Sequence, residues 1–344
     1  MRDKGKVAFN KLKKARKIHE GQVVRVTCMN HIVEILSLAI EPNALMKIRK
    51  LDKYRYVDLE TGEIHEYNVS ENRGDNIAGL KETFRKLRHL INNNFIGAAN
   101  ELFITLSYAE NVTDTKRLYQ DFDVFMKRFK RKYHDIDYLS IVEPQGRGAW
   151  HCHVLVRFNS LNKVYVSNND IIAPMWSHGF TKTKSLRDVD NIGAYLNAYL
   201  SDVEVCDENV ETIFGAIQHR ESAFDSIVNE FGEIVVVKRH EKISLEVVER
   251  EIDTDGKKIK KQFVKGARLH MYPSGMNLYR CSRGIKKPET EKMEYEEVKK
   301  IVGSTSPNYS RTIDILQEEK VINSITYEQY NLKRKEGKGS RNIL

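Results

Sequence analysis

The chain has few cysteines and no long apolar run. Its 344 residues contain four cysteines, at positions 28, 152, 206 and 281, and they form no Cys-x-x-Cys pair. Cysteines spaced in this way argue against a disulfide framework and against a zinc knuckle, and they favour reduced thiols in the cytoplasm. The longest apolar stretch, 32–40, is interrupted by Glu34 and Ser37, whereas a bilayer span needs about 20 residues. We expect a cytoplasmic protein with no membrane partner.

Two further motifs are absent from the sequence. The basic amino terminus is not followed by the apolar core of a secretory signal. The sequence also has no G-x-x-x-x-G-K-[ST] loop, which excludes a P-loop nucleotide hydrolase. Any unwinding of DNA that the function requires is therefore expected to come from another protein.

Basic residues outnumber acidic ones, which favours a nucleic-acid partner. The chain has 57 lysines and arginines against 48 acidic residues, for a formal net charge of +9. In segment 116–132, Lys127, Arg128, Lys130 and Arg131 alternate with phenylalanines at helical spacing. Such cations displace counterions from phosphates, so we name these four as DNA-binding candidates. For each of them, the alternative is the solvated face of a helix over a core stripe.

The most informative segment is 149–158, where His151 and His153 stand one residue apart among β-branched and aromatic residues. This composition predicts a β-strand. Alternate side chains of a strand share a face and are about 6.6 Å apart, so both imidazoles can reach one ion while Cys152 enters the core. Taken alone, the spacing is more often a satisfied or solvated histidine pair.

A third ligand is available in the preceding predicted strand, 138–143, which ends at Glu143. The loop 144–149 is rich in proline and glycine, so the two strands are predicted to form an antiparallel hairpin. Glu143 would then lie beside His151 or His153. Two imidazoles and one carboxylate leave coordination positions open, which favours a catalytic divalent-ion site over a closed structural one.

A helix is predicted for residues 188–200, where aspartates mark the start and Tyr195 and Tyr199 are four residues apart. Side chains at this spacing share one face of a helix. In an arbitrary chain, the same pattern usually supplies packing residues, with Ile192 and Leu196 in the core stripe.

In combination, these segments resemble the HUH endonucleases, and most closely the rolling-circle replication initiators of bacterial plasmids, phages and integrative elements. The strand 103–108 resembles the first motif of the family, 143–158 the motif with two histidines, and 195–200 the nucleophile motif. The similarity spans about residues 80–205. A later segment, 265–288, is also similar but less diagnostic.

The resemblance implies a nickase that depends on Mg or Mn. His151, His153 and Glu143 would hold the ion, which polarises the scissile phosphate. Tyr195 would attack single-stranded or hairpin origin DNA, form a 5′-phosphotyrosine and leave a 3′-hydroxyl primer. Tyr199 would serve a second strand transfer or only packing. The implied partners are a host helicase and a DNA polymerase in the bacterial cytoplasm.

Other functions stay open at this point. A mobilisation relaxase or a transposase would use the same chemistry, although histidines that precede the tyrosines favour an initiator or a transposase. A non-catalytic DNA-binding regulator predicts binding without cleavage. A 2-His-1-carboxylate iron oxygenase uses the same ligand types but leaves the tyrosines and the basic charge unexplained.

We expect an α+β protein with an antiparallel central sheet and helices against one face, as the HUH fold implies. Four regions are predicted: a basic amino-terminal region with a β-hairpin (1–79), an endonuclease core (80–205), a β-rich extension (206–288), and a helical carboxy-terminal region with a basic tail (289–344).

The remaining DNA-binding candidates lie in the hairpin loop and near the end of the β-rich extension. They are Arg147 in the loop and Tyr272, Tyr279 and Arg280 farther along the chain. Aromatic rings can stack on unpaired bases while an arginine contacts the backbone. Packing against the core is the alternative for this segment.

Overall fold

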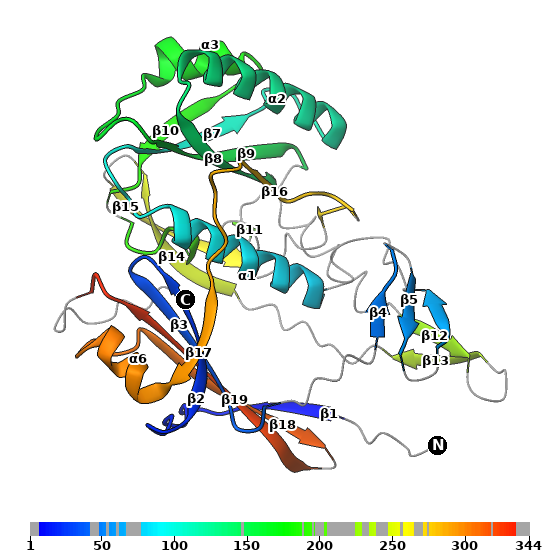
Figure 1. Cartoon of the computed structure of the whole chain (residues 1–344). Helices are drawn as coiled ribbons and strands as arrows, with labels where there is room; N and C mark the ends of the chain where they lie inside the picture. The colour runs from blue at the N-terminus through cyan, green and yellow to red at the C-terminus, as the bar shows by residue number, and fades with distance from the viewer. Residues whose placement is uncertain are drawn as a thin grey trace.

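The computed structural model describes most of the chain. The described residues are 7–41, 48–52, 55–59, 62–66, 77–145, 148–187, 189–194, 196, 203–204, 224–228, 234–238, 247–254, 257–264, 271–273, 275–317 and 319–334. Tyr195, Tyr199 and Arg147 lie outside them. The described part is α+β with antiparallel sheets (Figure 1), and none of its helices is long and apolar enough to cross a membrane.

The central sheet has five antiparallel strands in the order β10-β7-β9-β8-β16. Their bounds are β7 Glu101–Ser107, β8 Ile136–Pro144, β9 Trp150–Phe158, β10 Thr181–Ser185 and β16 Tyr279–Cys281. β8 and β9 form the hairpin that the loop composition predicts. β7 is the strand predicted as the first motif.

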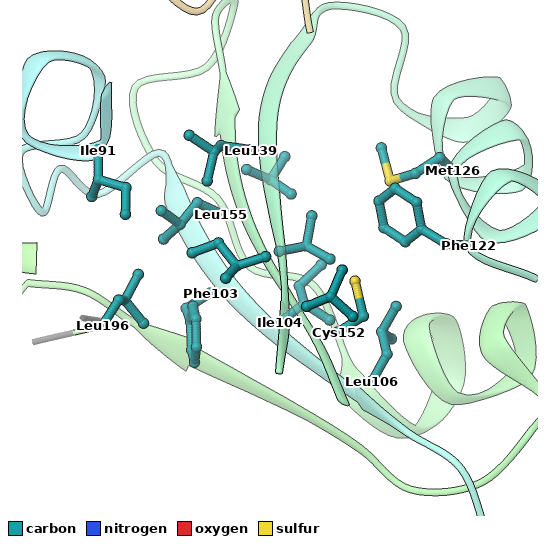
Figure 2. Close-up of a cluster of buried hydrophobic side chains, with 14 of the residues drawn as sticks. Ile91, Phe103, Ile104, Leu106, Phe122, Met126, Leu139, Cys152, Leu155 and Leu196 are labelled. Atoms are coloured by element: carbon teal, nitrogen blue, oxygen red, sulfur yellow. The ribbon is translucent and has the colours of Figure 1, made fainter. Parts of the chain in front are cut away.

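Helices cover both faces of this sheet. On one face, Phe122 and Met126 of α2 (Thr115–Lys132) pack near Cys152 and Leu106 (Figure 2). A π-helical segment, Asn168–Ile172, leads into α3 (Ala173–Trp176), which contacts α2.

On the opposite face, Ile91 of α1 (Ile77–Asn94) lies near Leu155, as Figure 2 shows. The expectation of helices against one face is therefore wrong. The physical reason is that β7 is buried at six of its seven positions, so side chains on both of its faces need apolar cover.

A second sheet is built from both ends of the chain. Its order is β1-β18-β19-β3-β2-β17, with bounds β1 Val7–Lys11, β2 Val23–Met29, β3 Ile32–Leu38, β17 Thr290–Glu294, β18 Tyr309–Gln317 and β19 Lys320–Asn331. We call it the terminal sheet. Figure 1 shows α1 between this sheet and the central one.

The carboxy-terminal region was expected to be helical, and this expectation is wrong for most of it. One helix, α6 (Tyr295–Val302), packs on the terminal sheet through Val298. Residues 309–331 form the antiparallel β18–β19 hairpin instead. The burial of β19 alternates along the strand, which is the period-2 pattern of a sheet with one covered face. The four predicted region boundaries stay predictions.

Three small sheets complete the described part. The first joins β4 (Ile48–Lys50), β5 (Arg55–Asp58) and β6 (Ile64–Glu66); the second joins β11 (Val203–Glu204), β15 (Lys257–Val264) and β14 (Val247–Thr254); the third joins β12 (Phe224–Val228) and β13 (Ile234–Lys238). The pairing of β5 with β6 and of β14 with β15 confirms the β-structure predicted in these two regions.

A buried carboxylate joins the terminal sheet to α1. Oε2 of Glu34 on β3 lies 2.7 Å from Nε2 of His89, and Nη2 of Arg88 lies 3.1 Å from Oε1. Gln329 of β19 donates to Oε1 at 2.8 Å. Burial acts to raise the pKa of Glu34, but the hydrogen bond with His89 and the charge of Arg88 outweigh it, and the pKa is lowered to about 2.

The terminal sheet also grips the segment that leads into the predicted tyrosine helix. The main-chain oxygen of Asp190 lies 2.6 Å from Nε2 of His31 and accepts a hydrogen bond from Asn331 at 3.2 Å. The Asp190 carboxylate pairs with Arg334 at 2.5 Å. These three contacts hold Asp190 from both ends of the chain.

Gly193, three residues farther on, packs directly on α1. Its N–H donates to Oδ1 of Asn92 at 2.9 Å. A Cβ built at this position would lie 2.7 Å from the same Oδ1 and 2.8 Å from the main-chain oxygen of Arg88. Glycine therefore permits this close approach.

We predict that Glu34→Gln destabilises the protein at neutral pH but not in acid. A carboxylate whose pKa falls from 4.5 to about 2 on folding contributes about 3 kcal/mol above pH 4.5, and this contribution is lost as the pH falls through 2. Urea unfolding from pH 2 to pH 7 measures the difference. The exposed Glu297→Gln is the control, and a Glu34→Gln deficit that does not change with pH would contradict the prediction.

We also predict that Gly193→Ala lowers the free energy of unfolding by about 1–3 kcal/mol, because the new methyl group overlaps a main-chain oxygen that cannot withdraw. The matched control is Gly21→Ala, since nothing lies within 4 Å of a Cβ at that position. Chemical denaturation of both variants provides the test. Equal stabilities for the two would show that α1 yields to the added methyl group.

Candidate metal centre

The register of the β8–β9 hairpin brings the three predicted ligands to one face of the central sheet. Glu143 pairs with His151, and Ile141 pairs with His153. Because paired residues of an antiparallel ladder point to the same side, Glu143, His151 and His153 share a face. The predicted position of Glu143 beside the histidines is thereby confirmed.

The three side chains converge closely enough to hold one ion. One ligand atom from each of Glu143, His151 and His153 lies within 4.8 Å of the others. Nε2 of His153 is 3.3 Å from Oε2 of Glu143. Glu143 is buried and both histidines are half-buried, so solvent has restricted access to the group. We call these three residues the metal triad.

The surroundings of His153 hold its ring in one orientation. Its Nδ1 lies 3.2 Å from Oγ1 of Thr105, and its ring stacks on Phe103 with centroids 5.2 Å apart. A hydrogen bond at the second ring nitrogen is the usual way in which proteins orient a metal-ligating histidine.

The atoms of the metal triad fit a divalent cation. Nε2 of His153 is buried and has no hydrogen-bond partner among the described residues. When Nδ1 donates to Thr105, the lone pair of Nε2 faces Oε2 of Glu143 at 3.3 Å. Two electron-rich atoms at this separation in a buried site are stabilised by a cation between them.

A fourth residue, Gln145, lies at the metal triad and was not predicted. Its side-chain nitrogen contacts Nε2 of His151. Its main chain forms the tight turn of the hairpin, since its N–H donates to Ala149 and its carbonyl accepts from Gly148. The available signal was its place two residues after Glu143, in the loop that leads to the histidine strand.

The basic residues of α2 lie across the sheet from the metal triad. Lys127, Arg128, Lys130 and Arg131 are exposed, and the helix that carries them covers the face of Cys152 rather than the face of the histidines (Figure 2). Two of them have local contacts: Arg128 donates to the main-chain oxygen of Met175 at 2.8 Å, and Lys130 lies 4.8 Å from the ring centroid of Tyr138.

Tyr272 is a core residue. Its side chain has no exposed surface, and its ring lies 6.3 Å from the rings of both Phe84 and Trp150. A ring covered in this way cannot stack on a base, so the expectation of a DNA contact is corrected to the packing alternative.

Arg280 and Tyr279 point to opposite faces of the central sheet. The Arg280 guanidinium lies 4.0 Å from the ring centroid of Tyr119 and 3.2 Å from Asp123, both on α2. Tyr279 pairs with Ile141, which places it on the face of the metal triad. The two adjacent residues therefore do not form one binding surface.

The predicted tyrosine helix reaches the face of the metal triad. Residues 192–194 and 196 are helical, and Ile192 and Leu196 are buried in the main core. Figure 2 shows Leu196 on the side of the sheet where Phe103 lies. Tyr195 and Tyr199 fall outside the described residues, so their roles stay predictions.

Comparison with known proteins gives one match. Residues 101–204 match the sequence model of a family of replication-associated proteins of the ORF2 type. This interval begins at β7 and includes the metal triad together with Tyr195 and Tyr199. No curated protein matches the sequence. The family match supports a replication-related role of the Rep type for this chain.

Proposed function

We propose that the protein initiates rolling-circle replication by nicking and rejoining single-stranded or hairpin origin DNA. The observation that carries this proposal is the convergence of Glu143, His151 and His153 on the sheet face that also receives Leu196. This convergence lies inside the interval that matches a replication-associated family. A host helicase and a DNA polymerase would act on the nicked product.

The chemistry is a transesterification of the HUH type. A divalent ion, Mg or Mn, bound by the metal triad would supply Lewis-acid polarisation of the scissile phosphate. The Tyr195 oxygen forms a bond to phosphorus while the bond to the 3′ oxygen breaks, and that oxygen leaves as a protonated hydroxyl. The resulting 5′-phosphotyrosine ester retains the energy of the broken bond. Rejoining by the reverse reaction then needs no ATP, and Tyr199 is available for a second transfer.

Thr105 and Phe103 have a supporting part in this proposal. Thr105 fixes which nitrogen of His153 faces Glu143, and the stacked ring of Phe103 limits rotation of the imidazole. A ligand held in its binding orientation before the ion arrives loses less conformational entropy on binding.

Ion binding is testable without DNA. We expect Mn²⁺ to raise the unfolding temperature of the wild type, since a ligand at about 100 times its Kd adds about 2.7 kcal/mol of stability. Mn²⁺ should bind more tightly than Mg²⁺ because imidazole nitrogens are poor ligands for magnesium. Thr105→Ala should weaken Mn²⁺ binding about 10–100-fold, and His153→Ala should abolish it.

The control for ion binding is His134→Ala, because His134 is exposed and lies outside the metal triad. Isothermal titration with each ion gives the affinities directly. An unchanged Mn²⁺ affinity in His153→Ala would remove His153 from the ligand set.

Covalent chemistry is tested with 3′-labelled single strands that tile the DNA encoding and flanking this chain, because the adduct forms on the 5′ phosphate of the downstream fragment. We expect a labelled protein band on denaturing gels with Mg²⁺ or Mn²⁺ and none with chelator. Tyr195→Phe should reduce the band to background, whereas Tyr199→Phe should retain it.

Two outcomes of this experiment would contradict the proposal in different ways. Full adduct yield in both tyrosine variants would overturn the choice of nucleophile. Specific binding of one strand without any adduct would indicate a DNA-binding regulator in place of a nickase.

A further inference from the structure

The edge strand β10 places two lysines on the face of the metal triad. β10 follows β7 and β9 in the sheet order, and Lys182 pairs with Thr105, which in turn pairs with His153. Lys182 and Lys184 therefore point to the face of the histidines, while Thr181, which pairs with Leu106 on the other face, is buried at 4% exposure. Two inter-strand spacings of about 4.8 Å separate Lys182 from His153 along this row.

An exposed aromatic ring begins the same row of side chains. Phe180 precedes β10, and its carbonyl accepts a hydrogen bond from the N–H of Ser107 at 2.9 Å, so it continues the ladder opposite Ser107 and, through it, His151. Its side chain is 65% exposed. Alternation places it on the face of Lys182.

The backbone next to Phe180 has little freedom to move. At Gly179, an added Cβ would overlap main-chain atoms of Ser107, Tyr108 and Ala109. The N–H of Ala109 also donates to the carbonyl of His178 at 3.0 Å. The phenyl ring is therefore presented from a chain segment packed tightly on the end of β7.

We propose that Phe180, Lys182 and Lys184 form a binding site for single-stranded DNA along the sheet edge beside the metal triad. A base stacks on Phe180, and the lysines contact the phosphates that follow it. Aromatic rings combined with cations are the usual means by which proteins bind unpaired strands. This inference rests on the proposed function and extends it from the reaction to the grip on the substrate.

The site on β10 replaces the α2 lysines and arginines as the expected DNA contact. Lys127 and Arg131 extend from the helix that covers the opposite face of the sheet. A strand whose phosphate lies at the metal triad passes the β10 row on the same face, whereas it would have to wrap around the sheet to reach α2.

Binding is measured by fluorescence anisotropy with a labelled oligo-dT of about 20 nucleotides, which is longer than the site of a single binding module, in chelator, so that no cleavage contributes. We expect Phe180→Ala to weaken binding about tenfold with little change in its salt dependence, and Phe180→Trp to retain wild-type affinity, because stacking needs only an aromatic face. The variant with Lys182→Gln and Lys184→Gln should lose affinity and reduce the slope of log K against log salt by about 1.4.

The matched control carries Lys127→Gln and Arg131→Gln, which remove the same two charges from α2. It should bind with nearly the affinity of the wild type. Duplex DNA provides a second control, since its bases are already stacked and Phe180→Ala should not change its affinity.

Equal affinities of the wild type and both β10 variants would overturn the proposal, and so would a loss in the α2 control as large as that in the β10 double variant. The outcome is separable from the nicking test. Weakened binding in the β10 variants without any covalent adduct keeps the binding site and overturns the nickase. An adduct in the wild type with unchanged affinity in the β10 variants does the reverse.

Discussion

The candidate site depends on the register of one hairpin, in which Glu143 stands opposite His151. A slip of one residue in β8 would turn Glu143 toward α2 and separate it from the imidazoles. The register is held by the short turn at Gln145 and by apolar side chains on both faces of the sheet, such as Cys152 on one and Leu155 on the other. Hydrophobic packing therefore positions the polar atoms of the metal triad.

The two faces of the central sheet have different neighbours, and this difference organises the molecule. The α2 face is closed by helices and aromatic rings. The other face packs on α1, receives Leu196, and retains the metal triad at the end of the β8–β9 hairpin. Behind α1, Glu34 and the grip on Asp190 tie the terminal sheet to the same structure. The amino- and carboxy-terminal regions thus support the segment that leads into the predicted tyrosine helix.

Local sequence patterns predicted the parts of the fold that depend on local contacts. The spacing of Phe122, Met126 and Phe129 indicated α2, and alternation with a short loop indicated the hairpin of the metal triad. The terminal sheet was not predicted because its strands pair across the whole chain, as in β1 with β18, and such pairing leaves no local pattern. The burial of Tyr272 was missed for the same reason, since only tertiary packing places Phe84 and Trp150 around it.

Because the terminal sheet joins the two ends of the chain, it cannot be completed until synthesis is nearly finished. The N–H of Arg16 donates to Thr312, a partner 296 positions later, and Asp190 is held by Asn331 and Arg334. Contacts with such wide sequence separation slow folding. A chain still on the ribosome can complete the central hairpin early, but it gains the last supports of Asp190 only after release of its final strand.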